Sequence, residues 1–211
     1  MQLYEKYRPK SFENVIGQAK AIRQIESVAP YGGKAFFISG ASGTGKTTLA
    51  RIIAATIAQD WCIEELDSAD DLSVERIDTI ERTMYLYGAG KGGRAFIVNE
   101  FHGARANIVR KLLGILERIP NHVVFVFTST KEGQLQFFDG NIDANPLMSR
   151  CIYIGLSNQG LAKPFAEHCK KIAQIEGLDG QSPQAYYRLA QECKNNMRMM
   201  LQAIEAGEMK G

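Results

Sequence analysis

The sequence predicts an α/β protein built on a doubly wound parallel sheet. A glycine-rich loop, Gly40 to Thr47, follows the apolar run from Ala35 to Ile38 and opens a segment with helical periodicity. Two further apolar runs, Ala95 to Val98 and Val123 to Phe127, alternate with amphipathic stretches. Continuous apolar runs are typical of parallel strands covered on both faces, and their alternation with helices predicts the doubly wound arrangement.

The glycine-rich loop has the spacing of a phosphate-binding P-loop. It reads GASGTGKT, and Leu49, Ile52 and Ile53 behind it give the following helix an apolar face. Backbone NH groups and the helix dipole favour a triphosphate there; Lys46 is expected to reach the β- and γ-phosphates, and Thr47 to bind Mg²⁺. The residues expected to hold the phosphates are Gly40, Ser42, Gly43, Thr44, Gly45, Lys46, Thr47 and Thr48.

Composition and charge fit a protein of the cytoplasm that does not cross a membrane. The 211 residues carry 25 Lys and Arg against 23 Asp and Glu, so the net charge of +2 does not itself indicate nucleic-acid binding. The four cysteines form no C-x-x-C pair, which argues against a zinc module and a disulfide framework. The sequence has neither a signal peptide nor a long apolar span.

The remaining elements are expected in a regular order along the chain. Two domains are predicted, residues 1–156 with the sheet and residues 157–211 with three helices. Ser73 is expected to cap a helix that runs to Tyr85, and Cys151 to Ile154 to form a last short strand. The other expected helices cover about residues 19–28, 104–118, 161–176, 183–193 and 196–205, and a strand end is expected at residues 63–67.

ATP hydrolysis needs a group that orients the attacking water and a second protein ligand for Mg²⁺. The run FIVNE, Phe96 to Glu100, places Asn99 and Glu100 at the end of a buried strand, so Glu100 is the candidate general base. Asn99 stands where such a site usually has Asp. An amide oxygen still binds a metal-bound water but brings no charge, so Mg²⁺ is expected to be held less firmly. The alternatives are a solvated carboxylate at Glu100 and a plain turn residue at Asn99.

Three further groups are candidates with ordinary alternatives. A hydroxyl of Thr128, Ser129 or Thr130 closes the next strand and is in a position to bind the γ-phosphate or the attacking water. Arg150 precedes the last strand, and Arg198 lies among methionines on the last helix. From the residues alone, a solvated surface arginine is the ordinary interpretation of both and the favoured one for Arg150, whereas Arg198 is in an unusual place for a cation unless it faces an anion.

Taken together, these stretches resemble the clamp-loader ATPases of the AAA+ superfamily, such as the bacterial DNA polymerase III gamma/tau subunit and the small subunits of replication factor C. The similar stretches occur in the family's order over nearly the whole chain. They are LYEKYRPKSFENVIGQ, the P-loop, IEELDSADDLSVERIDTI, NEFH, LLGILERIPNHVVFVFTST, MSRC and NNMRMMLQAIE. The resemblance implies a P-loop AAA+ doubly wound parallel sheet followed by a small three-helix lid.

The resemblance also assigns roles to single residues. It implies that Thr130 is sensor 1, that Arg198 is the sensor 2 arginine on the γ-phosphate, and that Arg150 is an arginine finger for a neighbouring subunit. The residues that would border the adenine base are Tyr7, Arg8, Pro9, Val15 and Ile16. The implied cofactors are ATP and Mg²⁺, and the implied partners are other clamp-loader subunits in a ring or spiral, a sliding clamp and primer-template DNA.

The chain departs from the family pattern in three respects: Asn99 replaces Asp, the cysteine-rich zinc insertion is absent, and no collar domain follows the lid within these residues. We therefore expect the isolated chain to be a monomer or a weak oligomer. The first functional hypothesis is an ATPase subunit that opens and loads a sliding clamp. The alternatives are an assembly subunit that binds ATP with negligible hydrolysis, and another AAA+ role in DNA remodelling, such as a helicase loader or a Holliday-junction motor.

Overall fold

The computed structural model describes residues 1–130, 134–135 and 143–211, and these form two compact units. The sheet unit comprises Ala19–Gly40 and Lys46–Gly155. The lid unit comprises Met1–Gln18, Ala41–Gly45 and Leu156–Gly211. The sequence predicts a domain boundary at residue 156. In the structure, Met1–Gln18 and Ala41–Gly45, the arc of the P-loop, also group with the C-terminal helices.

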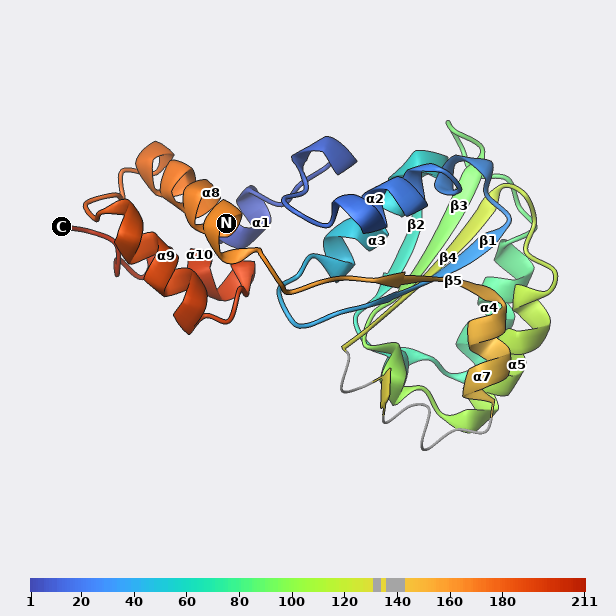
Figure 1. The fold of residues 1–211 in the computed structure, drawn as a ribbon. Helices are drawn as coiled ribbons and strands as arrows, with labels where there is room; N and C mark the ends of the chain where they lie inside the picture. Colours follow the sequence, from blue (N-terminus) through green and yellow to red (C-terminus); the bar gives the residue numbers. More distant parts are fainter. Residues whose placement is uncertain (131–133, 136–142) are drawn as a thin grey trace. The chain divides into compact units, whose positions relative to one another are not determined.

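The sheet unit contains a five-stranded sheet in the order β2-β3-β4-β1-β5. Every pair of neighbouring strands is parallel, which confirms the predicted doubly wound sheet (Figure 1). The strands are β1 (Lys34–Ser39), β2 (Ala58–Leu66), β3 (Gly93–Val98), β4 (Val123–Ser129) and β5 (Cys151–Gly155). The central strand β4 is buried along its whole length, as its unbroken apolar run predicts.

Helices cover both faces of this sheet. Figure 1 shows α2 (Ala19–Glu26) and α3 (Lys46–Ile57) on one face. The other face carries α4 (Val74–Thr83), α5 (Ala106–Leu116) and α7 (Ala144–Ser149) (Figure 1). Short 3-10 turns complete the unit: η2 (Ala29–Tyr31), η3 (Ala69–Asp71) and η4 (Phe101–Gly103).

Some elements differ from the sequence prediction. The strand expected near residues 63–67 begins at Ala58, directly after α3, because the chain enters the sheet without a connecting loop. α7 was not predicted, since its six residues, with Pro146 among them, are too few to show a helical period. The helix expected over residues 104–118 spans Ala106–Leu116. The predicted cap is confirmed, since the Arg76 backbone NH donates to Ser73 Oγ at 3.1 Å.

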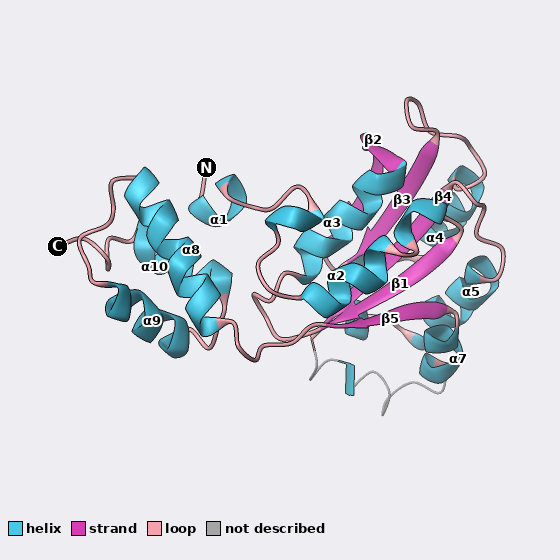
Figure 2. Cartoon of the chain, turned by 45° about the horizontal axis from the view of Figure 1, so that its top comes forward, coloured by secondary structure: helices cyan, strands magenta, loops and turns pink. Residues whose placement is uncertain are grey.

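The lid unit is helical (Figure 2). It contains α1 (Leu3–Lys6), η1 (Phe12–Asn14), α8 (Ala162–Ile175), α9 (Pro183–Glu192) and α10 (Met197–Glu205). Leu3 of α1 packs into the apolar core formed by α8, α9 and α10, and the Leu3 backbone NH lies 3.5 Å from Glu205 Oε2. Among the described residues, none of the helices combines the length and the apolar character needed to cross a membrane.

Candidate nucleotide-binding site

The P-loop begins where β1 ends, and its backbone is fixed at both ends. The Gly40 NH donates to the Ser129 carbonyl of β4 at 3.3 Å. Lys46 is the first residue of α3, is 7% exposed, and donates from Nζ to the Gly40 carbonyl at 3.1 Å. The ammonium group therefore folds back over the start of its own loop. This position puts the predicted phosphate-binding cation beside the backbone turn that it is expected to serve.

The arc of the loop depends on a glycine. Gly43 has a φ of 75°, and a Cβ built there would lie 2.0 Å from Asn196 Oδ1, within the lid unit. Asn196 caps α10 by accepting from the Met199 backbone NH at 3.3 Å. Asn196 Nδ2 also lies 3.5 Å from Ser42 Oγ. The loop arc and the first turn of α10 are thus packed without room for a side chain.

We expect Gly43→Ala to lower the thermal midpoint of unfolding by several degrees and to weaken nucleotide binding. The left-handed backbone costs about 1 to 2 kcal/mol for an L-residue, and the new methyl group also collides with Asn196. Gly160→Ala is the matched control, since its φ is 73° and a Cβ added there would meet no other atom within 4 Å. Equal losses of stability in the two variants would show that the contact with Asn196 carries no cost.

The end of β3 meets the start of α3 through one buried amide. Asn99 Oδ1 accepts from Thr47 Oγ1 at 3.1 Å and from Thr128 Oγ1 at 3.0 Å. Thr47 and Asn99, the two predicted magnesium ligands, therefore converge, and both offer the oxygen that Mg²⁺ prefers. The described residues hold no cluster of three or more acidic, His or Cys side chains suited to a metal. Mg²⁺ in nucleotide sites usually has few protein ligands, and phosphate oxygens complete its coordination shell.

Glu100, the predicted general base, sits in an unusual backbone conformation. Its φ is 46° and its ψ is 45°, the left-handed region that non-glycine residues rarely adopt. The carboxylate is about half exposed, and Oε2 lies 3.5 Å from His102 Nδ1. Strained residues of this kind gather at functional sites. With 47% of its side chain exposed, the carboxylate is within reach of water.

The hydroxyl groups at the end of β4 divide into two environments. Thr128 and Ser129 are fully buried, whereas Thr130 is half-buried. Thr128 binds Asn99, and Ser129 Oγ lies 3.3 Å from His102 Nδ1 and donates to the Thr130 carbonyl at 3.0 Å. Thr130, the predicted sensor 1, is thus the most accessible hydroxyl of the three.

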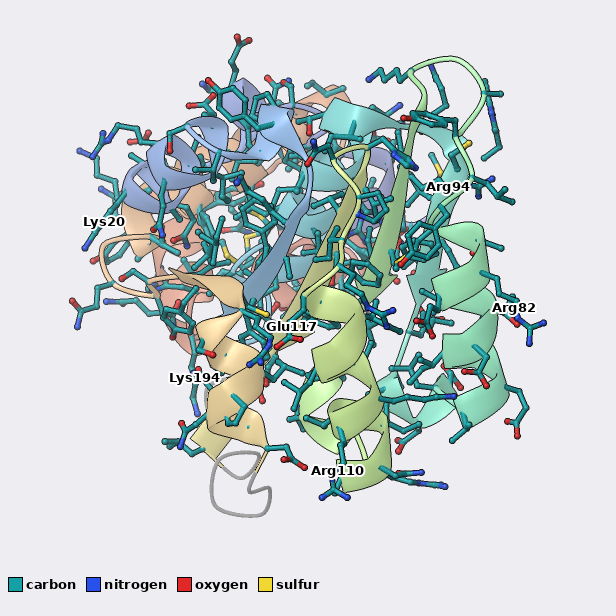
Figure 3. The ribbon with its side chains drawn as sticks, turned by 90° about the vertical axis from the view of Figure 1, so that its right-hand side faces the viewer. Lys20, Arg82, Arg94, Arg110, Glu117 and Lys194 are labelled. Carbon is teal, nitrogen blue, oxygen red and sulfur yellow. The ribbon has the colours of Figure 1, made fainter. Side chains whose placement is uncertain are left out.

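Arg150, the predicted arginine finger, is held by its own chain. Its Nε donates to Glu117 Oε1 at 3.1 Å, its Nη2 makes a second contact with the same oxygen, and its Nη1 donates to the Pro146 carbonyl at 2.7 Å. Figure 3 shows Glu117 at the end of α5, on the side of α7. The guanidinium group is therefore fixed at the surface, beside α7, with 30% of its side chain exposed.

The remaining predicted residues belong to the lid unit. The Arg198 guanidinium lies over the Tyr4 ring, 5.3 Å from its centroid. The Lys6 ammonium and, after it, the Tyr7 hydroxyl donate to Glu176 Oε1, and together they hold the pKa of that carboxyl below its usual value. Arg8 pairs with Glu5, and Ile16 packs against the lid core. Pro9 and Val15 are half-buried.

Sequence reasoning missed three residues that contact the predicted ones: Glu65 accepts from Asn99 Nδ2 at 2.9 Å, Glu117 pairs with Arg150, and Asn196 lies against Ser42. Glu65 and Glu117 are acidic residues near the ends of a strand and a helix, and their partners are 34 and 33 positions away. Such pairings depend on how distant strands and helices pack, which a local pattern does not reveal. The cap at Asn196 was open to prediction, because Asn before an apolar helix is a common N-cap.

The chain resembles several known proteins in sequence. The family model described as magnesium chelatase, subunit ChlI, matches residues 11–86. A DNA polymerase III subunit gamma of Buchnera aphidicola, strain APS, is 28% identical over 203 residues, which cover 84% of this chain and 53% of that protein. The DNA polymerase III subunit gamma/tau of Mycobacterium bovis is 32% identical over 62% of this chain and 27% of that protein. The chain thus spans about half, or less, of the relatives it matches.

Solved structures show the same fold. RuvB of Thermotoga maritima matches with a TM-score of 0.74 and 20% identity, over 94% of this chain and 64% of that one. Domain III of the replication initiation protein DnaA from the same organism matches with a TM-score of 0.66 and 14% identity, over 96% and 91% of the two chains. This chain is therefore similar in sequence to the bacterial DNA polymerase III gamma and gamma/tau subunits, and it has the P-loop α/β fold of these solved structures.

Proposed function

We propose that this chain is an ATP-binding and ATP-hydrolysing subunit of a clamp loader in DNA replication. ATP binding would order a ring or spiral of subunits that holds a sliding clamp open at primer-template DNA, and hydrolysis would release the clamp. The observation that carries the proposal is the joining of Thr47, Asn99 and Thr128 at the end of the P-loop. The sequence similarity of this chain to DNA polymerase III subunits supports the replication role.

Each residue has a defined part in this proposal. Lys46 neutralises phosphate charge, and Thr47 and Asn99 are the residues that would hold Mg²⁺. When bound, Mg²⁺ offsets the charge of the phosphates and fixes their geometry. Glu100 orients and deprotonates the attacking water, and Thr130 and Arg198 bind the γ-phosphate. Arg150 stabilises the charge that develops in the site of a neighbouring subunit.

Asn99 favours a second candidate function, a subunit that uses ATP as a structural ligand and hydrolyses it negligibly. The Asn99 amide occupies a position where relatives of this kind are expected to have a carboxylate, so the site lacks one negative charge next to Thr47. Weak metal binding would slow phosphoryl transfer more than nucleotide binding. Binding of ATP with Mg²⁺ but without turnover, with and without primed DNA and a clamp, would identify this function.

The basic residues of α5 and of the turn after it give little support for a separate DNA site. Arg110 pairs with Asp143 at 3.2 Å, and Lys111 pairs with Asp78. Arg118 pairs with Glu81 at 2.9 Å. Since each cation already has an acidic partner, DNA binding through these side chains would have to break an ion pair. We therefore place primer-template DNA among the partners of the assembled loader and assign no contact residue to it.

Lys46→Ala tests the nucleotide-binding proposal. We expect the variant to lose at least tenfold in affinity for a fluorescent ATP analogue, because the buried ammonium of Lys46 lies 3.1 Å from the Gly40 carbonyl at the start of the loop. Lys20→Ala is the control, since Lys20 is an exposed lysine of α2 at the outer surface (Figure 3). Equal affinity in the wild type and in both variants would contradict the assignment of the P-loop.

A further inference from the structure

Asn99 is held by hydrogen bonds on both sides of its amide. Oδ1 accepts from Thr47 and Thr128, while Nδ2 donates to Glu65 Oε1 at 2.9 Å and to the Leu66 carbonyl at 3.3 Å. The residue is only 7% exposed. A buried side chain with four partners has no freedom to turn, so its neighbours decide which atom faces the P-loop.

The partners leave only one orientation. A carboxylate and a backbone carbonyl accept hydrogen bonds but do not donate them. The amide nitrogen must therefore face Glu65 and Leu66, and the oxygen must face Thr47. If Glu65 were apolar, the amide would lose its charged partner and could turn its nitrogen toward Thr47, where an NH₂ group would repel a cation.

Glu65 is itself fixed in place. It lies on β2, where it pairs in register with Ile97 of the neighbouring strand β3. Its second oxygen, Oε2, accepts from Arg51 Nε of α3 at 2.7 Å. The side chain of Glu65 is 18% exposed, so little water competes for it. The result is a chain of contacts that runs from Arg51 through Glu65 and Asn99 to Thr47.

We propose that Glu65 is a positioning residue that replaces, through Asn99, the negative charge missing at position 99. A charged acceptor on Nδ2 polarises the amide and increases the negative character of Oδ1. Outer partners of this kind orient metal ligands and typically change metal affinity or activity by about 10- to 100-fold when they are mutated. The inference rests on the proposed function, because it assigns Glu65 to the same magnesium site.

The contact predicts an unusual response to Asp at position 99. In Asn99→Asp, the new carboxylate would face the Glu65 carboxylate and the Leu66 carbonyl where an NH₂ group now donates. Like charges at that separation repel strongly in a partly buried site. The double exchange, Glu65→Gln combined with Asn99→Asp, places an amide donor at position 65 opposite a carboxylate acceptor at position 99. The negative charge then lies directly beside Thr47.

The test uses four variants: Glu65→Gln, Asn99→Asp, the double exchange and Glu64→Gln. Glu64 is the matched control, because adjacent residues of a strand project to opposite faces and Glu64 pairs with Arg76 at 2.9 Å. Two quantities are measured: the thermal midpoint without nucleotide, and the affinity for a fluorescent ATP analogue with and without Mg²⁺. The ratio of the two affinities reports the Mg²⁺-dependent part of binding.

We expect Glu65→Gln to reduce the Mg²⁺-dependent gain in affinity about tenfold, with affinity in the absence of Mg²⁺ unchanged. Asn99→Asp is expected to melt several degrees below the wild type, and the double exchange to recover both the midpoint and the Mg²⁺ response. A Glu65→Gln variant that matches Glu64→Gln, or a double exchange no more stable than Asn99→Asp, would overturn the inference alone. A wild-type chain that binds no nucleotide would overturn the proposed function with it.

Discussion

Arg150→Ala is expected to reduce ATP turnover by about a thousandfold in the assembled protein, with primed DNA and a sliding clamp present. An arginine supplied to a neighbour's phosphate is typically responsible for about 10³- to 10⁵-fold in rate. Nucleotide affinity should change little, since the proposal gives Arg150 no part in its own chain's site. The measurement is steady-state hydrolysis together with affinity for a fluorescent ATP analogue.

The loss of Arg150 should not unfold the protein. Its partner Glu117 is 57% exposed, so solvent can replace the ion pair. Arg118→Ala is the control, because Arg118 makes a similar exposed pair with Glu81. A control variant that loses as much activity as Arg150→Ala would mean that the effect comes from surface charge.

Mixing two inactive variants tests whether Arg150 acts on a neighbouring chain. Arg150→Ala keeps Lys46 and Glu100, whereas Glu100→Gln keeps Arg150. If active sites form between chains, a mixture should recover part of the activity, because some interfaces then combine the intact Glu100 of one chain with the intact Arg150 of the next. Activity that stays at the level of the separate variants would place Arg150 outside the neighbour's site.

Glu100→Gln is expected to reduce turnover by about 10²- to 10⁴-fold, the usual contribution of a general base, while ATP still binds. Gln keeps the size of the side chain and the left-handed turn but cannot accept the proton of the attacking water. The measurement is a single-turnover assay with Mg²⁺. Glu26→Gln, at an exposed position of α2, is the control for loss of a negative charge. Turnover retained in Glu100→Gln would assign the base to another group.

Much of the fold was predictable because its signals are local. The apolar runs of β1, β3 and β4, the P-loop and the cap at Ser73 each depend on a few consecutive residues. The arrangement of the sheet follows from rules for parallel strands. The sequence also indicated Thr47 and Asn99 as the two magnesium ligands, since the P-loop follows β1 and Asn99 ends a buried strand; that the two side chains bond to each other is seen only in the structure.

The remaining details depend on contacts between distant parts of the chain. Glu65 becomes a partner of Asn99 only through the register of β2 and β3. α1 has four residues and joins the C-terminal helices through Leu3, a contact between opposite ends of the sequence. Glu117 meets Arg150 because α5 and α7 cover the same face of the sheet. None of these residues carries a local signal that distinguishes it from an ordinary surface or core residue.

The two outermost strands limit how copies of this protein can associate. Ala58 of β2 pairs with Gly93 of β3, and Ile63 pairs with Ala95, so β2 uses more residues than β3 over this stretch and bulges. Trp61 lies in this bulge and is exposed. On β5 the Tyr153 carbonyl is occupied by Gln24 Nε2 at 3.1 Å. Bulged or covered edges are poor templates for a further strand. In the proposed ring or spiral, copies would therefore have to meet through side-chain surfaces and not by extending the sheet from one chain to the next.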